Sequence, residues 1–340
     1  MRDVEVVMTS VATGRSRPKI LSYGGGLDSF AMLLGAIERG IKIDVCVFID
    51  TGHPDDPSEW PSTYRHVNEV VRPLCAAHGI EFVQLDHTNY PLRAGRKDEA
   101  RSLFAWLQAH NQIPVSGPDR VCTVIAKVER FEAWMDERYP GQEVEVWIGF
   151  DAVEKKRAAN DPNAGAPRMP TGMRLRSTTA GSKRHQQQAV LHNAFLWTRA
   201  LAFALTTARR INRFPLIEWD LCRCRCEALV RESGHPVPRK SACTFCPYGS
   251  RGDWQRFAVE LPEQFARVVE LEANKPPTIE NNLKLSIMDY RDGKASMLPE
   301  YIAKPYTRKI IRCVVCGAAQ RATKAAGCGY LDEGPTEVAA

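Results

Sequence analysis

Ser22-Tyr23-Gly24-Gly25-Gly26-Leu27-Asp28-Ser29 is the stretch that decides the fold of this 340-residue chain. It lies between an apolar run, Lys19–Tyr23, and an apolar-periodic stretch, Phe30–Gly40. This order predicts a strand, a glycine turn and the start of a helix. Consecutive glycines can turn successive N–H groups inward, and the first turn of a helix favours a phosphate. The stretch therefore predicts an anion site, with a plain tight turn as the alternative.

The glycine spacing narrows the kind of phosphate site. It is not that of a dinucleotide-binding fingerprint, and no Gly-Lys-Ser/Thr ending follows, so a Walker-type loop is excluded. Asp28 or Ser29 can cap the helix that follows the loop. Asp28 is alternatively a ligand for Mg²⁺.

Strand-like and helix-like stretches alternate from Pro18 to Phe150. The expected strands are Lys19–Tyr23, Ile43–Asp50, Glu81–Asp86 and Val144–Phe150, and the expected helices are Ser29–Arg39, Thr63–His78, Glu99–His110 and Ala126–Arg138. This alternation predicts an α/β fold, a Rossmann-like parallel sheet with covering helices. Ligands of such sheets bind beyond the carboxyl ends of the strands, so Asp50 and Thr51 would share an edge with the glycine loop.

The composition is that of a soluble protein, with 44% hydrophobic and 25% charged residues. A net charge of +6 permits a nucleic-acid partner without arguing for one. No apolar stretch approaches the ~20 residues that cross a bilayer, and the N-terminus has no signal-peptide pattern. We therefore expect a cytoplasmic protein with no membrane partner. In a reducing compartment, its eleven cysteines are better explained as metal or cluster ligands than as disulfides.

The predicted organisation has three parts: a nucleotide-binding domain over 18–213, a cysteine-containing module over 214–305, and a cysteine-rich basic tail over 306–340 with a disordered end. Within the first part, 151–188 is rich in glycine, proline, serine and basic residues. It is predicted to be a flexible loop, either simply solvated or a lid or polynucleotide contact. A helix is predicted over Ala189–Arg210, and a hinge over Phe214–Trp219.

Cys243-Thr244-Phe245-Cys246 is the strongest metal-type motif. Two thiolates at this spacing can bind one iron or zinc ion, or adjacent irons of a cluster. A thiol–disulfide pair and simple buried sulfur are the alternatives. Cys313, Cys316 and Cys328 are predicted to form a second, smaller site, which Cys222 or Cys224 would complete. Zinc, a second cluster and free thiols all remain open there.

The glycine loop resembles the pyrophosphatase loop (PP-loop) of the adenine-nucleotide alpha-hydrolase superfamily, usually Ser-Gly-Gly-x-Asp-Ser. Gly25, Gly26, Asp28 and Ser29 match this motif, whereas Gly24 stands in place of the first serine. Further segments resemble the branch of this superfamily that is similar to phosphoadenosine phosphosulfate (PAPS) reductase, over about Pro18–Leu271. They are Cys122-Thr123 with Lys127, Ile148-Gly149 with Glu154 and Arg157, Phe214–Trp219, and Lys240–Tyr248.

The resemblance implies an adenine nucleotide as ligand: ATP, PAPS or adenosine phosphosulfate (APS). The nucleotide-binding residues it implies are Ser22, Gly24, Gly25, Gly26, Asp28, Ser29, Asp50 and Thr51, the last two near adenine and ribose. Lys127, Arg157 and Lys240 would supply positive charge, and the catalytic residues would be Ser29, Lys127 and Arg157. By analogy with cluster-carrying relatives, a [4Fe-4S] cluster would be held by Cys122, Cys226, Cys243 and Cys246, with Cys222 or Cys224 as the alternative to Cys226.

Three functions are compatible with these features. The first is a PP-loop enzyme that adenylates an acceptor with ATP, for sulfur transfer to tRNA, DNA or a small metabolite, with a sulfur donor protein as partner. The second is a PAPS or APS reductase that releases sulfite. Such reductases carry a C-terminal Glu-Cys-Gly-Leu/Ile-His segment, whereas this chain has Gly327-Cys328-Gly329-Tyr330. The third is a non-catalytic nucleotide- or nucleic-acid-binding subunit of a modification or defence complex. Relatives often form homodimers.

Overall fold

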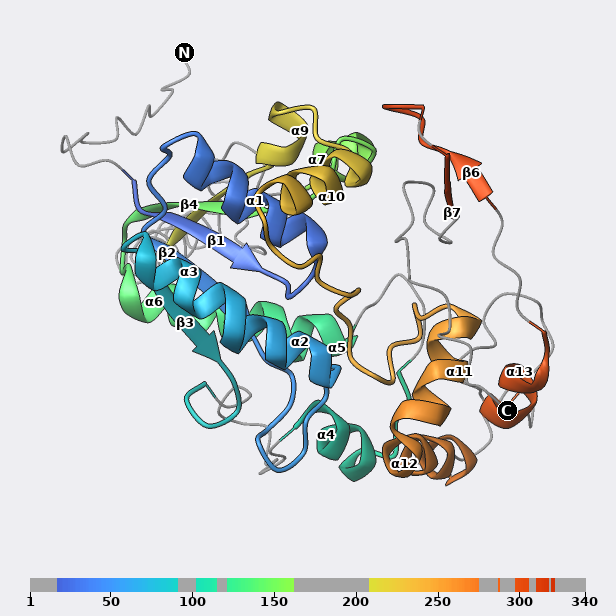
Figure 1. Ribbon diagram of the computed structural model, residues 1–340. Helices are drawn as coiled ribbons and strands as arrows, with labels where there is room; N and C mark the ends of the chain where they lie inside the picture. The colour runs from blue at the N-terminus through green and yellow to red at the C-terminus, as the bar shows by residue number, and fades with distance from the viewer. Residues whose placement is uncertain are drawn as a thin grey trace, which may run out of the picture.

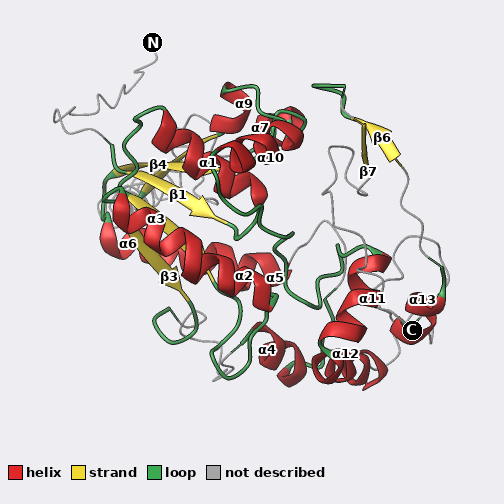
Figure 2. Ribbon diagram, in the orientation of Figure 1, coloured by secondary structure: helices red, strands yellow, loops and turns green. Residues whose placement is uncertain are grey.

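The main body of the protein is a five-stranded parallel sheet with helices on both faces (Figures 1 and 2). The computed structural model describes residues 17–90, 102–114, 121–161, 208–274, 287, 297–305, 310–317 and 319–321. The strands are β1 (Lys19–Tyr23), β2 (Val45–Ile49), β3 (Glu81–Leu85), β4 (Glu143–Ile148) and β5 (Arg209–Arg213), in the spatial order β3-β2-β1-β4-β5. All four pairings are parallel, so the expected α/β Rossmann-like class is confirmed.

Side chains alternate between the two faces of the sheet, and each face has its own helices. Leu21 and Tyr23 of β1 belong to one apolar core, together with α1 (Leu27–Glu38). Ile20 of the same strand belongs to the opposite core, which includes residues of α6 (Glu129–Arg138). The central strand β2 reads Val-Cys-Val-Phe-Ile and is buried almost throughout, because helices cover both of its faces.

Two helical runs contain a π-turn. The first joins α2 (Pro61–His66), η1 (Val67–Val71) and α3 (Arg72–Ala77), and the second joins α5 (Val121–Thr123), η2 (Val124–Val128) and α6. Pro73 has no N–H to continue the regular helical ladder, which accounts for the wider turn that precedes it in the first run. The second run carries Cys122 and Lys127 towards the carboxyl edge of the sheet.

Apart from the two cores on the faces of the sheet, a separate apolar cluster lies beside the sheet; it is called the second apolar cluster below (Figure 1). It joins α4 (Leu103–Ala109), α11 (Arg251–Glu260), α12 (Pro262–Asn274) and α13 (Leu298–Ala303). Trp254 and Phe257 of α11 are almost fully buried in it. Ser250 and Asp253 form a reciprocal capping box at the start of α11, which fixes where this helix begins after the Cys243–Cys246 segment.

The segment that follows Phe214 starts inside the core of the sheet domain. α9 (Pro215–Glu218) and α10 (Arg223–Glu232) pack against α1 through Leu216, Cys226 and Val230. The sequence predicts only a hinge over 214–219, because the four-residue α9 is too short to show helical periodicity.

Two further elements are α7 (Lys155–Ala159) and an antiparallel hairpin of β6 (Ile310–Arg312) and β7 (Ala319–Arg321).

β5 is a strand that the sequence does not predict. The helix expected over 189–210 overlaps it at Arg209 and Arg210, where the structure has an edge strand instead. Its sequence Arg-Arg-Ile-Asn-Arg lacks the apolar alternation of a half-buried strand, so the pattern is invisible without the neighbouring β4. Residues 189–207 of that predicted helix, most of the predicted loop over 151–188, and Glu99–Arg101 lie outside the described residues.

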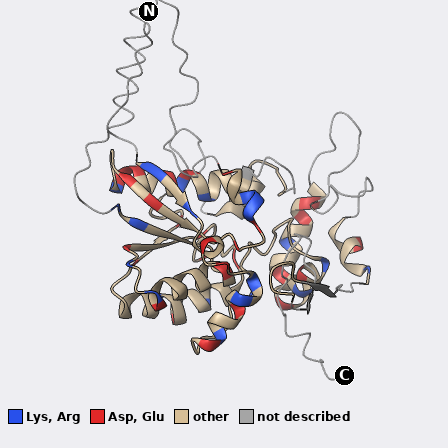
Figure 3. Cartoon of the chain, turned by 90° about the horizontal axis from the view of Figure 1, so that it is seen from above, with Lys and Arg blue, Asp and Glu red and all other residues tan. Residues whose placement is uncertain are grey.

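Acidic and basic segments lie side by side along the described elements (Figure 3), in keeping with the small net charge. Within the part of the chain that the structure describes, no helix is long and apolar enough to cross a membrane.

Candidate functional site

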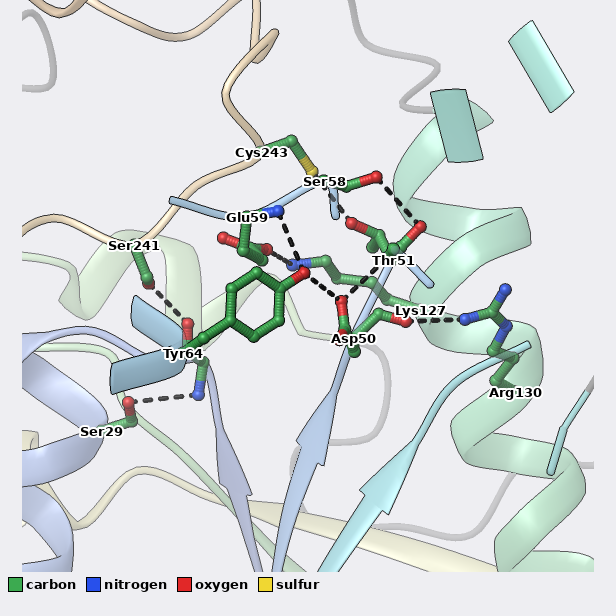
Figure 4. Close-up of polar contacts among 12 residues, drawn as sticks. Ser29, Asp50, Thr51, Ser58, Glu59, Tyr64, Lys127, Arg130, Ser241 and Cys243 are labelled. Atoms are coloured by element: carbon green, nitrogen blue, oxygen red, sulfur yellow. Dashed lines mark hydrogen bonds and ion pairs between the residues drawn. The ribbon is translucent and has the colours of Figure 1, made fainter. Parts of the chain in front are cut away.

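The glycine loop joins β1 to α1 at the carboxyl edge of the sheet. Gly25 has a φ of +77°, a left-handed conformation, and a Cβ added there would lie 2.7 Å from Thr63 Cγ2. Only glycine fits this position without strain. The Ser29 hydroxyl closes the loop, because its Oγ accepts from Gly24 N at 3.1 Å and donates to Gly26 O at 3.0 Å. Ser241, far along the chain, donates to Gly24 O (Figure 4).

No side chain caps α1, so the expected cap by Asp28 or Ser29 is wrong. The N-cap residue is Gly26, which has no side chain to offer, and Ser29 is engaged within the loop. The first N–H groups of a helix have no intrahelical acceptor, and those of α1 lie at the edge of the sheet. Gly149, just after β4, packs on this helix start: an added Cβ would lie 3.1 Å from Ser29 N. The loop therefore lies at the crevice between β1 and β4, where the strand order reverses.

Asp28 is the charged group closest to this loop. Its Oδ2 lies 3.3 Å from Arg223 Nη1, whereas its Oδ1 is buried without a hydrogen-bond partner. Burial raises the pKa of Asp28 to about 6; Arg223 opposes the shift, and Asp151 and Glu154 add to it. A carboxylate with one unpaired oxygen at this edge fits the open alternative of a Mg²⁺ ligand.

Asp50 and Thr51, which follow β2, are already engaged by protein groups (Figure 4). Asp50 Oδ1 accepts from Tyr64 Oη and from Gly52 N, each at 2.8 Å, and Asp50 Oδ2 accepts from Gln84 Nε2 at 3.4 Å. Thr51 Oγ1 shares a 3.2 Å hydrogen bond with Cys243 Sγ. Both side chains are buried, so in this structure they join the sheet edge to the cysteine motif.

An ion pair between a buried carboxylate and a partly exposed ammonium lies beside that edge. Glu59 is 2% exposed, and its Oε1 lies 3.4 Å from Lys127 Nζ. Burial raises the pKa of Glu59, and Lys127 opposes this shift. Arg130, one turn further along, is equally buried and donates from Nη1 to Asp50 O at 2.8 Å (Figure 4). Sequence reasoning missed Glu59, Tyr64 and Arg130, because no motif marks them and only the fold brings them to Asp50.

Three of the four cysteines proposed as cluster ligands gather near Lys127. Cys122 and Cys243 pack on the second apolar cluster, and the Cys243 and Cys246 thiols neighbour the Lys127 side chain. Burial raises the pKa of the Cys246 thiol, with a smaller contribution from the neighbouring Cys122. Cys226 is placed elsewhere: it is fully buried on α10 in the core against α1, with Asp28 among its charged neighbours.

The other predicted cations have carboxylate partners. Arg157 Nη1 lies 2.8 Å from Glu154 Oε1, and the Arg157 guanidinium stacks on Phe150 after β4. Lys240 Nζ lies 3.2 Å from Asp253 Oδ2, in a segment that also lines a small pocket with Cys243 and Cys246.

Ser22 is the fourth residue of β1 and pairs in register with Ile148 of β4. Cys328 lies outside the described residues.

The structure forms a four-cysteine cluster from Cys222, Cys224, Cys313 and Cys316. Their sulfur atoms all lie within 4.8 Å of one another, and among the described residues no other set of three or more metal-binding side chains is this compact. The sequence predicts Cys313 and Cys316 at a second site and offers Cys222 or Cys224 to complete it. The structure uses both, a Cys-x-Cys motif facing a Cys-x-x-Cys motif.

No protein-family model matches the chain, and no curated protein matches it. Seven solved chains are similar to it, and two of them are described here. The phosphate complex of phosphoadenylyl-sulfate (PAPS) reductase from Candida auris shares 15% identity, over 67% of this chain and 78% of that protein, with a TM-score of 0.34. The U34-tRNA thiolase NcsA from Methanococcus maripaludis, with its [4Fe-4S] cluster, shares 15% identity over 85% of this chain and 82% of that protein, with a TM-score of 0.35. Neither likeness specifies a reaction for this chain.

Proposed function

We propose that this chain is a PP-loop ATP pyrophosphatase that transfers adenylate from ATP to an acceptor and releases pyrophosphate. The observation that carries the proposal is the Gly24–Gly26 loop, which sets the start of α1 at the crevice between β1 and β4. Backbone donors at this position in an open parallel sheet suit a polyphosphate. Gly25 keeps its left-handed conformation in tight contact with Thr63, so the loop is held in shape before a ligand arrives.

The reaction is a displacement at the α-phosphorus. An acceptor oxygen forms the new P–O bond, the bond to the bridging oxygen of the β-phosphate breaks, and its electron pair leaves on pyrophosphate. The loop amides stabilise the charge that develops on the departing pyrophosphate. Ser29 acts by holding these amides in place through its bonds to Gly24 and Gly26.

Three basic side chains from different parts of the chain come to the carboxyl edge of the sheet. Arg223 lies at the glycine loop through its contact with Asp28. Lys127 lies at the end of β2 beside Glu59, and Lys240 precedes Ser241, which bonds to the loop. Arg157 is half-exposed on α7 and serves as a fourth candidate. Charge-assisted contacts of this kind are roughly twice as strong as neutral ones.

An iron–sulfur cluster fits the three cysteines near Lys127. Cys122 and Cys243 pack on the same apolar cluster, and each is a neighbour of Cys246. Thiolates gathered from separate segments in this way can bind different irons of a [4Fe-4S] cluster. When bound by three thiolates, such a cluster offers one iron to an outside sulfur or oxygen ligand. In its more specific form, the proposal is that the enzyme transfers sulfur to the adenylated acceptor, which is tRNA or DNA.

The test is pyrophosphate release by the anaerobically purified chain with ATP, Mg²⁺ and a panel of acceptors that includes bulk tRNA and duplex DNA. We expect release together with AMP, reduced at least tenfold in Ser29→Ala, whose loop has lost its closing hydroxyl. Unchanged release in that variant would remove the proposal. Sulfite formed from PAPS without any pyrophosphate chemistry would instead show a reductase. Tight ATP binding with no turnover over the whole panel would show a binding subunit.

A further inference from the structure

We propose that Cys222, Cys224, Cys313 and Cys316 bind a single zinc ion, which is separate from any iron–sulfur cluster at Cys122, Cys243 and Cys246. The basis is the compactness of the set, since all four sulfur atoms lie within 4.8 Å of one another. None of the four thiols forms a disulfide. Four thiolates are the full ligand set of a closed structural zinc site.

The sulfur spacing distinguishes one ion from a cluster. With zinc–sulfur bonds of about 2.3 Å, the thiolates of a tetrahedral site lie about 3.8 Å apart. In a [4Fe-4S] cluster each thiolate binds a different iron, which spreads the sulfur atoms to about 6 Å or more. An upper limit of 4.8 Å for every pair leaves room for one ion and none for a cube of iron and sulfide.

The surroundings are also those of a structural metal site. Cys222 is fully buried and Cys313 is 4% exposed, while Cys224 and Cys316 are partly exposed. Ala152, Val153 and Val315 pack around the thiols as a small apolar cluster of their own. The Val315 amide donates to Cys313 Sγ at 3.4 Å, the kind of N–H···S contact that stabilises a thiolate.

The ion would join three parts of the chain that are distant in sequence. Cys222 and Cys224 lie at the start of α10, and Cys313 and Cys316 lie in the turn between β6 and β7. In Figure 1 this turn points from the hairpin towards α7 and α10. Ala152 N donates to Leu221 O at 2.9 Å, which adds the segment after β4 to the same assembly. A two-stranded hairpin this short is marginal on its own, and a four-thiolate metal site is a sufficient anchor.

The proposed zinc site has one consequence for the nucleotide site, and this consequence rests on the proposed function. Arg223 lies between two of the ligands and forms the ion pair with Asp28 at the glycine loop. Bound zinc would fix the backbone on both sides of Arg223 and so hold its guanidinium towards the loop. Loss of the ion is expected to weaken ATP binding several-fold even though no ligand of the metal touches the nucleotide.

The test is metal and sulfide analysis of the full chain purified without oxygen. We expect about one zinc per wild-type chain, lost in Cys313→Ser/Cys316→Ser with iron and sulfide unchanged. The matched variant Cys243→Ser/Cys246→Ser is expected to keep zinc and lose iron. Zinc retained in the first variant, or iron and sulfide lost from it in place of zinc, would overturn the assignment.

A second measurement on the wild-type chain covers the case in which the double variant does not fold. Titration with p-hydroxymercuribenzoate should release zinc in step with the reaction of four thiols, and Co²⁺ exchanged into the site should show the absorption bands of tetrahedral thiolate coordination. Zinc-free protein with a Cys313–Cys316 disulfide would refute the site. Zinc content does not depend on nucleotide chemistry, so a chain with zinc but no ATP binding would refute the proposed function alone.

Discussion

The Arg223 guanidinium lies 3.3 Å from the Asp28 carboxylate, and this pair links the start of α10 to the glycine loop. Both side chains are mostly buried, with 21% of each exposed, so water screens the attraction between their charges only partly. The pair also places a cation beside the first turn of α1, where the proposed function puts the phosphates of a nucleotide.

Replacing Arg223 should therefore weaken nucleotide binding. In Arg223→Gln the loop loses its nearest cation, and the Asp28 carboxylate remains there without its partner. We expect the affinity for ATP, measured by calorimetry, to fall about tenfold or more. Arg225→Gln is the matched control, because Arg225 pairs with Asp220 at 2.7 Å on the exposed side of α10 and should bind ATP as the wild type does. Equal losses in both variants would contradict a local role for Arg223.

The raised pKa of Asp28 predicts a pH dependence of binding. With a pKa of about 6, Asp28 is largely neutral at pH 5 and negative at pH 7, beside the phosphates. Without Mg²⁺, affinity for a non-hydrolysable ATP analogue should fall as the pH rises through this window, and more steeply than in Asp28→Asn. The comparison of the two proteins removes the titration of the ligand itself, which both share.

The same experiment with Mg²⁺ examines the alternative role of Asp28. If Asp28 holds the cation, the wild type should bind the Mg²⁺ complex more tightly as the pH rises, and Asp28→Asn should lose that gain. Parallel pH profiles for wild type and variant under both conditions would mean that Asp28 has neither role.

Gly25 should be the least replaceable residue of the loop. Gly25→Ala forces a left-handed alanine and brings its Cβ within 2.7 Å of Thr63, so we expect a loss of about 2–4 kcal/mol in the free energy of unfolding. Gly40→Ala is the control, since Gly40 has a φ of +62° with no atom within 4 Å of an added Cβ. It should cost about 1 kcal/mol, the conformational penalty alone. Urea unfolding compares the two, and a larger loss in Gly40→Ala would argue against the packed loop.

The Glu59–Lys127 pair should respond asymmetrically to truncation. Lys127→Met leaves a buried carboxylate without its cation and should cost about 3 kcal/mol at pH 8. Glu59→Gln should cost less, because Lys127 is 35% exposed and can be solvated. Without Lys127, the folded-state pKa of Glu59 rises further above its unfolded value. The folded state then binds the extra proton, so the loss should shrink as the pH falls towards 5. A loss independent of pH would show that Glu59 carries no charge in the wild type.

The strands that carry the loop could be predicted from the sequence because their patterns are local. β1, β2, β3 and β4 are short runs rich in β-branched and aromatic residues, and the long helices between them have apolar periodicity. β5 could not, since its side chains are charged and its identity as a strand comes from pairing with β4. The loop itself was recognisable from three glycines and Ser29, whose roles are fixed by the turn they form.

The side chains around the loop were less predictable for a physical reason. The sequence shows Cys243 and Cys246 as a pair, but only the fold reveals that Cys226 lies under α1, with Cys222 and Cys224 facing the hairpin instead. The partners of Asp50 are likewise set by tertiary packing. A sequence motif identifies residues that lie close together in the sequence. Contacts between distant residues at the edge of the sheet depend instead on how the strands and helices are connected.

The most direct test of the central claim is a calorimetric titration of the intact, anaerobically prepared chain with α,β-methylene-ATP, alongside Ser29→Ala. If the loop amides hold the polyphosphate, the wild type should show saturable binding at one site that pyrophosphate displaces, and Ser29→Ala should bind at least tenfold more weakly. A folded wild-type chain that gives no binding heat, or a variant that binds as tightly as the wild type, would contradict the account.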